Sequence, residues 1–309
     1  MKKLLIPILF LLILLITACN NDEPTETNGT GKDSVEESTT ITYDSEEGPI
    51  EVPADPKRVV VVSTYAGNVA ALGVNLVGVD AWSKSNPQFD KYFADVEEVS
   101  EDNLEKIIEL EPDLIIGLST AKNLDKLKEI APTVTFTYGK VDYLTQHLEI
   151  GKLLNKEKEA QEWIDDFKKR AQTAGEEIKG KIGKDTTVSV IENFDKQLYV
   201  FGDNWGRGTE IIYQEMKLAM PEKVKEMALK DGFYALSLEV LPEYAGDYII
   251  FSKVGTQDNS FQETDVYKNI PAVKEGRVFE AVAEEFYFND PISLDYQLAF
   301  FKENFLNSK

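Results

Sequence analysis

The sequence predicts an α/β protein of two Rossmann-like lobes joined by a single long connecting helix, with a ligand cleft between the lobes. Three observations predict this fold class: a phrase that occurs twice, an alternation of short apolar runs with helical segments, and one long amphipathic segment between the halves. Roughly 270 residues follow the polar stretch near the N-terminus, which is enough for two lobes of ordinary domain size.

The repeated phrase lies at Leu104–Ile116 and returns 134 residues later at Leu238–Ile250. Six of its thirteen positions are identical, and two of them are glutamates, Glu105 with Glu239 and Glu109 with Glu243. Each copy ends in an apolar run typical of a short buried strand. Glu105 and Glu239 either meet a pseudo-symmetric partner that contacts both lobes, or are helix-start carboxylates favoured by the helix dipole.

Residues 1–18 have the charged start and apolar middle of a secretory signal peptide, and the apolar run is short for a membrane span. Small residues then precede Cys19, the only cysteine, as in a bacterial lipobox. We expect Cys19 to be diacylated and to hold the protein on the outer face of the cell membrane. An ordinary signal peptide with an incidental cysteine is the alternative. Residues 19–38 are expected to form the lipidated cysteine and a disordered tether.

Residues 39–155 are expected to form the N-terminal lobe. Thr40–Tyr43 and Ile50–Val52 alternate around Gly48-Pro49, which predicts a hairpin with its turn at that pair. Apolar and helical segments then alternate, which favours a mostly parallel sheet. The expected strands are Arg58–Ser63, Leu76–Asp80, Leu114–Leu118 and Val134–Tyr138, and the expected helices include Asn68–Leu72 and Leu124–Ile130.

Residues 156–182 carry apolar side chains at helical spacing and predict a connecting helix about 40 Å long, which restricts closure of the lobes to small adjustments. Residues 183–309 are expected to form the C-terminal lobe. Its predicted strands are Thr187–Glu192, Tyr248–Ser252 and Arg277–Val282, and its predicted helical segments include Thr209–Lys217 and Lys268–Ala272.

Composition excludes several classes of function. The chain has 33 basic and 55 acidic residues, a net charge of −22, which disfavours nucleic acid as a partner. His147 is the only histidine and lies in a helical segment, where a structural role is expected, so neither a Ser-His nor a Cys-His nucleophile can be assembled. A direct zinc or manganese site lacks ligands for the same reason. We therefore expect that the protein is no enzyme and has no cofactor. We also expect it to be a monomer.

The loop Gly202–Gly208 follows a predicted strand and precedes a helical segment. Its three glycines permit unusual backbone conformations beside Trp205 and Arg207. One interpretation is a binding loop that offers an indole platform and a guanidinium. In the other, Trp205 caps the core of the lobe and Arg207 pairs with a neighbouring acid. Five aromatic residues lie in or beside loops that follow predicted strands, and we expect them to converge on one cleft: Tyr65, Tyr138, Tyr199, Trp205 and Tyr287.

The chain resembles the iron-siderophore-binding lipoproteins of ABC importers in Gram-positive bacteria, particularly the ferric-hydroxamate receptors. The resemblance is carried by the lipobox, Pro56-Lys57-Arg58, Thr64–Gly67, Glu105–Ile116, Phe194-Asp195-Lys196, Gly202–Gly208, Tyr244–Tyr248 and Asn289-Asp290-Pro291. It implies a shallow cleft in which Arg207 donates to hydroxamate oxygens while Trp205 and Tyr199 pack on the ligand. The siderophore holds the iron, so no side chain ligates it directly.

The resemblance also implies that Glu105 and Glu239 dock on the two ABC permease subunits. One departure concerns Tyr287, which stands where hydroxamate receptors carry a tryptophan and keeps an aromatic wall of different shape. Arg207 is the evident cleft cation among four arginines, which suits a neutral or cationic ferric hydroxamate such as ferrioxamine or ferrichrome better than an anionic catecholate. The alternatives are a haem or cobalamin-type receptor and a surface sensor or adhesin lipoprotein.

Overall fold

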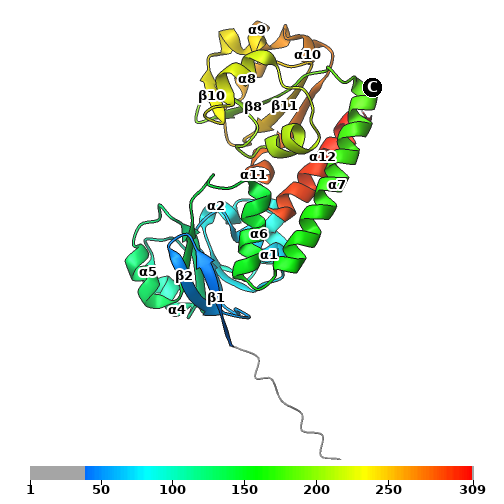
Figure 1. The fold of residues 1–309 in the computed structure, drawn as a ribbon. Helices are drawn as coiled ribbons and strands as arrows, with labels where there is room; N and C mark the ends of the chain where they lie inside the picture. The colour runs from blue at the N-terminus through cyan, green and yellow to red at the C-terminus, as the bar shows by residue number, and fades with distance from the viewer. Residues whose placement is uncertain (1–38, 308–309) are drawn as a thin grey trace, which may run out of the picture. The chain divides into compact units, whose positions relative to one another are not determined.

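The computed structural model describes residues 39–307. The signal peptide expected at 1–18 and the lipidated Cys19 with its tether at 19–38 lie outside the described residues. Within the described part of the chain, no helix is both long and apolar enough to cross a membrane. Two five-stranded sheets with flanking helices and a separate two-stranded hairpin make up this part (Figure 1), in agreement with the predicted fold class.

The N-terminal sheet is parallel throughout, with the strand order β5-β4-β3-β6-β7. Its strands are β3 (Val59–Val61), β4 (Leu76–Val79), β5 (Glu97–Glu98), β6 (Leu114–Leu118) and β7 (Thr133–Phe136). Its helices are α1 (Ala66–Ala71), α2 (Ala81–Lys84), η1 (Pro87–Phe89), α3 (Asp90–Phe93), α4 (Leu104–Glu109), α5 (Leu124–Ile130) and α6 (Tyr143–Leu153). Val59 and Val61 pack in one core and Val60 in another, so both faces are buried, which explains the unbroken apolar runs. The predicted bounds of β6 and α5 are confirmed.

The C-terminal sheet has the order β10-β9-β8-β11-β12. Its strands are β8 (Val188–Phe194), β9 (Gln197–Phe201), β10 (Phe233–Leu236), β11 (Tyr248–Lys253) and β12 (Val278–Val282). Strands β8, β11 and β12 are parallel, whereas β9 and β10 pair antiparallel. Its helices are η2 (Glu210–Glu215), α8 (Glu222–Ala228), η3 (Leu238–Glu243), η4 (Ser260–Glu263), α9 (Asp265–Lys268), α10 (Pro271–Lys274) and α11 (Ala283–Phe286).

Three local expectations need correction. The turn of the hairpin β1 (Thr40–Ser45) and β2 (Gly48–Pro53) lies at Glu46-Glu47, because Gly48 and Pro49 already pair in β2. The helical segment expected at Thr209–Lys217 is a short π-helix, η2. The segment expected at Lys268–Ala272 spans a break between α9 and α10, where Pro271 starts a new helix because it has no N–H for the preceding one.

The connecting helix α7 (Glu157–Ile182) begins within one residue of its expected start. Its buried positions recur every three or four residues, among them Ile164, Phe167, Ala171 and Ile178. The C-terminal helix α12 (Pro291–Asn307) lies beside α7 (Figure 1) and also packs on α1 of the N-terminal lobe. Two long helices therefore run alongside each other where the lobes are joined.

Candidate functional site

The loop between β9 and η2 has an unusual backbone. Gly206, Arg207 and Gly208 are all left-handed, with φ of +68°, +60° and +77°. A Cβ atom on Gly206 would lie 2.6 Å from the Tyr287 carbonyl oxygen, so only glycine fits there. The Arg207 N–H donates to the Phe286 carbonyl at 2.6 Å. The loop is thus fixed against the end of α11 and the residue that follows it.

The Arg207 side chain is paired with a buried acid. Its Nη2 and Nε atoms donate to the two carboxylate oxygens of Glu192 in β8, at 2.7 and 3.2 Å, and the Ser252 hydroxyl also donates to Glu192. The Glu192 side chain is 0% exposed and that of Arg207 is 14% exposed. This is the pairing that the structural interpretation of the loop predicts. It also means that the guanidinium reaches the surface with its charge already balanced.

Two aromatic rings flank the Arg207 guanidinium. Its Cζ atom lies 4.9 Å from the centre of the Phe201 ring and 4.6 Å from that of Tyr287. On its other side, Tyr287 stacks on Trp82 of α2, with ring centres 4.6 Å apart and planes 18° apart. Because Trp82 belongs to the N-terminal lobe, this stack bridges the lobes.

From Phe201 the contacts continue in the opposite direction. Tyr199 lies 6.5 Å from Phe201 and 5.9 Å from Phe233, Trp205 lies 5.1 Å from Phe233, and Tyr138 meets Trp205 edge-on at 6.0 Å. Tyr138 comes from the N-terminal lobe again. We call this unbroken series the aromatic arc; it consists of Trp82, Tyr287, Arg207, Phe201, Tyr199, Phe233, Trp205 and Tyr138.

The structure brings together most of the site residues that the sequence predicts. Tyr138, Tyr199, Trp205, Arg207 and Tyr287 all belong to the aromatic arc. Tyr65 does not: it is buried, packs edge-on against Phe136, and its hydroxyl has no hydrogen-bond partner. Burial raises the pKa of that hydroxyl.

Sequence reasoning missed two partners of these residues. Trp82 lies three residues after the end of β4, so the rule that selected Tyr65 and Tyr138, an aromatic residue soon after a strand, would have selected it too. Glu192 lies within the otherwise mostly apolar strand β8, where a buried charged residue needs a partner. The partner itself was not evident, because Arg207 is fifteen residues away and reaches Glu192 only through the loop.

A cavity of about 660 Å³ lies between residues of the two lobes. Tyr65 and Tyr138 line it from the N-terminal lobe, and Asn204, Glu210 and Asn289 from the C-terminal lobe. Burial raises the pKa of Glu210, although the Gly206 N–H at 3.0 Å and the Asn289 amide at 3.3 Å donate to its carboxylate and oppose the shift. Glu210 thereby connects the glycine loop to the short segment between α11 and α12.

The only histidine has a structural environment. His147 is 1% exposed, its Nδ1 lies 3.0 Å from the Asn68 amide oxygen, and its ring meets Trp163 edge-on. Burial lowers its pKa to about 4. In residues 39–307, no three His, Cys, Asp or Glu side chains are grouped so that they could hold a metal ion.

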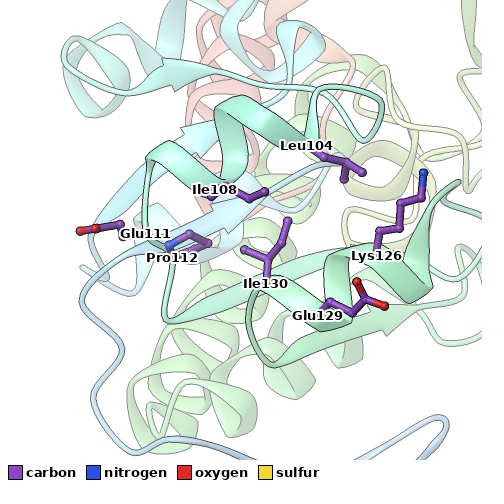
Figure 2. Close-up of a pocket in the computed structure, with 7 residues that line it drawn as sticks. All are labelled: Leu104, Ile108, Glu111, Pro112, Lys126, Glu129 and Ile130. Carbon is purple, nitrogen blue, oxygen red and sulfur yellow. The ribbon is translucent and has the colours of Figure 1, made fainter.

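Glu105 and Glu239 occupy equivalent places in the two lobes. Both are exposed, and they lie in the first turns of α4 and η3, which lead into the equivalent strands β6 and β11. Hydrogen bonds from its own backbone N–H and from Ser237 lower the pKa of Glu239. Next to Glu105, a groove of about 690 Å³ runs between α4 and α5 (Figure 2), and Ile108 and Ile130 point into it.

Comparison with known proteins places this architecture in a family. Residues 59–284 match the family model described as periplasmic binding protein. The iron(3+)-hydroxamate-binding protein YxeB of Bacillus subtilis is 37% identical over 310 residues, which cover 96% of this chain and 95% of that protein. The iron(3+)-hydroxamate-binding protein FhuD of Bacillus subtilis is 38% identical over 301 residues, which cover 95% of this chain and 94% of that protein.

A solved structure agrees with both relatives. FhuD2 from Staphylococcus aureus with bound ferrioxamine B superposes with a TM-score of 0.78 at 37% identity, over 81% of this chain and 98% of that one. The chain belongs to the periplasmic binding protein family.

Proposed function

We propose that this chain is an extracytoplasmic receptor that binds ferric hydroxamate siderophores of the ferrioxamine or ferrichrome type and delivers them to an ABC importer. The observation that carries the proposal is the aromatic arc, whose only cation is Arg207 with its charge balanced by Glu192. The names of YxeB and FhuD, and the ferrioxamine B bound to FhuD2, support this ligand class. The protein acts as a binding protein without catalysis, and the siderophore's own oxygens hold the iron.

Charge favours a neutral or cationic complex. A ferric tris-catecholate is a multiply charged anion and requires several cations to offset its desolvation, whereas a tris-hydroxamate is neutral or cationic. Beside the arc, the cavity holds both acids and lysines: Asp142, Asp203, Glu210 and Glu215 with Lys140, Lys168 and Lys217. This nearly balanced set suits a hydroxamate better than a catecholate.

Arg207 is expected to bind the ligand through the part of its guanidinium that stays exposed. Trp205, Tyr138, Tyr199 and Tyr287 are expected to supply ring faces and edges around the siderophore's apolar arms. Tyr65, which lines the cavity with its hydroxyl buried, is expected to contribute to the cavity wall rather than to donate to the ligand.

Delivery is assigned to Glu105 and Glu239. Both are exposed, one in each lobe, and neither forms a salt bridge within the described residues. We assign them to basic sites on the two permease subunits, with the chain tethered through a lipid on Cys19 at the outer face of the membrane. Charge-assisted contacts of this kind set the orientation of an encounter.

Titration of the purified full-length protein in detergent tests the ligand. Ferrioxamine B, ferrichrome, a ferric catecholate, haem and cobalamin are added separately while tryptophan fluorescence is followed. We expect saturable quenching with the two hydroxamates and none with the catecholate. Quenching by haem or cobalamin alone would establish the alternative receptor class, and quenching by none of the five would favour the sensor or adhesin.

Uptake of radiolabelled iron as ferrioxamine B tests the partner. We expect the Glu105→Ala/Glu239→Ala double variant to bind ferrioxamine B like the wild type but to lose uptake in cells that lack other receptors, with each single variant less affected. Glu109→Ala and Glu243→Ala, which alter the second pair of repeated glutamates, serve as matched controls. Normal uptake by the double variant, at normal surface levels, would mean that the repeated glutamates reflect shared ancestry or helix capping and do not dock on the permease.

A further inference from the structure

Tyr138, at one end of the aromatic arc, lies on a tight turn. It is the second residue of the turn Thr137–Lys140, in which the Lys140 N–H donates to the Thr137 carbonyl at 3.1 Å and Gly139 is left-handed with φ of +74°. Its side chain is 49% exposed. An exposed turn with few apolar contacts moves easily unless other groups hold it.

One carboxylate holds this turn at both ends. Glu46, at the tip of the β1–β2 hairpin, accepts hydrogen bonds from the Thr137 N–H at 3.1 Å and from the Thr137 hydroxyl at 2.7 Å. Its Oε2 atom also lies 3.2 Å from the Lys140 ammonium. The contacts join the first and fourth residues of the turn, with Tyr138 between them.

The electrostatics of Glu46 agree with this geometry. Burial opposes ionisation of the carboxylate, but the hydrogen bonds from Thr137 and the charge of Lys140 outweigh it, so its pKa lies below the ordinary value. The group is therefore ionised at neutral pH, and its hydrogen bonds are charge-assisted.

The hairpin that carries Glu46 is itself fixed. Tyr43 and Val52 are buried in the core of the N-terminal lobe, and the Tyr43 hydroxyl donates to Glu149 at 3.3 Å. The adjacent tip residue, Glu47, contacts different groups: Lys128 of α5 at 2.5 Å and the Thr135 hydroxyl at 3.4 Å. Glu47 thus shares the hairpin with Glu46 but does not touch the turn.

We propose that Glu46 is a positioning residue that sets the place of the Tyr138 ring against Trp205 and, through it, the affinity for the siderophore. The inference rests on the proposed function and adds the N-terminal hairpin to the binding site. We expect its effect on affinity to run through Tyr138 rather than through the Lys140 ammonium that it also pairs, so the loss of Glu46 should change binding little once Tyr138 is absent.

Amide hydrogen exchange of the ligand-free, full-length protein tests the positioning without any ligand. We expect Glu46→Ala to speed exchange of the Thr137 amide and of its turn, because the acceptor is lost. Glu47→Ala serves as the matched control and leaves the turn unchanged. Unchanged exchange in Glu46→Ala overturns the positioning role whatever the protein binds.

A double-mutant cycle with ferrioxamine B then tests the consequence. We expect Glu46→Ala to weaken binding about five- to tenfold, which corresponds to the free energy of roughly one hydrogen bond. Glu47→Ala should change the affinity less than about twofold. Glu46→Gln, which keeps an acceptor for Thr137, should recover part of the affinity. The Glu46→Ala/Tyr138→Ala variant should bind no more weakly than Tyr138→Ala.

The outcomes separate this inference from the proposed function. Additive effects in the cycle, or equal effects of Glu46→Ala and Glu47→Ala, overturn the positioning role while the protein remains a siderophore receptor. A wild-type protein that binds no ferric siderophore overturns the proposed function and with it the role in affinity, whereas the exchange data still decide whether Glu46 holds the turn.

Discussion

The two lobes order their strands alike but connect them differently. In the N-terminal sheet, β3 passes through α1 to β4, and all strands run parallel. In the C-terminal sheet, β8 turns directly into β9 through Asp195 and Lys196, both left-handed with φ of +48° and +66°, so β9 runs antiparallel. The second strands of the two sheets, β4 and β9, are therefore followed by different structures: β4 leads into α2, and β9 leads into the loop Gly202–Gly208.

This difference divides the work at the aromatic arc. The C-terminal lobe supplies its middle, including the left-handed loop with Arg207 and the buried Glu192 behind it. The N-terminal lobe supplies the two ends, Trp82 and Tyr138, which are 42% and 49% exposed. We infer that the C-terminal part of the arc is rigid and tolerates few substitutions. The N-terminal residues Trp82 and Tyr138 instead adjust how well the arc matches the shape of the ligand.

The buried ion pair should give the largest contrast. From the sequence alone, Arg207→Ala is expected to leave the fold intact. With Glu192 buried, we expect it instead to lower the free energy of unfolding by about 3–5 kcal/mol, because an unpaired carboxylate remains. Lys140→Ala, which breaks an exposed pair in the N-terminal lobe, should cost less than about 1 kcal/mol.

Adding Glu192→Gln to Arg207→Ala should restore most of the stability, because it removes the unpaired buried charge. Ferrioxamine B binding should stay weaker than in the wild type in both variants, because the Arg207 donors are absent. Urea unfolding and tryptophan quenching measure the two effects separately. A stable Arg207→Ala single variant would show that Glu192 does not depend on Arg207.

Two left-handed glycines extend the comparison. Gly206→Ala should lower the free energy of unfolding by roughly 3 kcal/mol or more and abolish ligand binding. The new Cβ would collide with the Tyr287 carbonyl oxygen, and the positive φ at this position is unfavourable for alanine. Gly139→Ala in the N-terminal lobe meets nothing within 4 Å and should cost only the backbone strain, about 1–2 kcal/mol. Equal losses of stability in the two variants, measured by thermal unfolding, would mean that the backbone strain alone causes the loss and that the contact with Tyr287 adds nothing.

Stability should depend on pH in opposite directions at two buried groups. Burial lowers the pKa of His147 to about 4, so its contribution is lost as pH falls from 6.5 towards 4. Burial raises the pKa of Asp290 to about 6, against hydrogen bonds from Ser293 and Ile292, so its contribution is lost as pH rises from 3.8 to 6. Each effect amounts to about 3 kcal/mol, and between pH 4 and 6 they largely cancel.

Single variants should separate the pH dependence of stability that each of the two groups causes. His147→Gln should become less stable as pH rises from 4 to 6, and Asp290→Asn less stable as pH falls from 6.5 to 4. Urea titrations at several pH values measure this. Parallel pH profiles for the wild type and both variants would contradict the assignment.

The smallest effect is expected at Trp82. Trp82→Ala removes one ring of the stack with Tyr287 and should weaken ferrioxamine B binding about three- to tenfold, while stability changes by about 1 kcal/mol. Tyr92→Ala, at an exposed aromatic residue of α3, is the matched control and should leave binding unchanged. A larger loss at Trp82 than at Arg207 would reverse the inferred division between the lobes.

The parts predictable from the sequence were those with a local cause. β6 and α5 have bounds equal to those expected, and α7 is offset by one residue, because apolar spacing alone specifies them. The antiparallel pair β9–β10 was not expected, since strand direction depends on pairing. Trp82 and Glu192 became site residues only through contacts with Tyr287 and Arg207, which lie far away in the sequence.

The returning C-terminal segment has a consequence for the order of folding. Phe288 is buried in the N-terminal core, where its ring lies 5.3 Å from Phe89, and α12 packs on both α1 and α7. The first lobe therefore cannot complete its interior until nearly the whole polypeptide has been synthesised. Contacts between residues so far apart in the sequence slow folding, and a chain that lacks the C-terminal segment stays incompletely folded. For a protein proposed to act outside the cytoplasm, this late completion would help the chain to cross the membrane before its first lobe is finished.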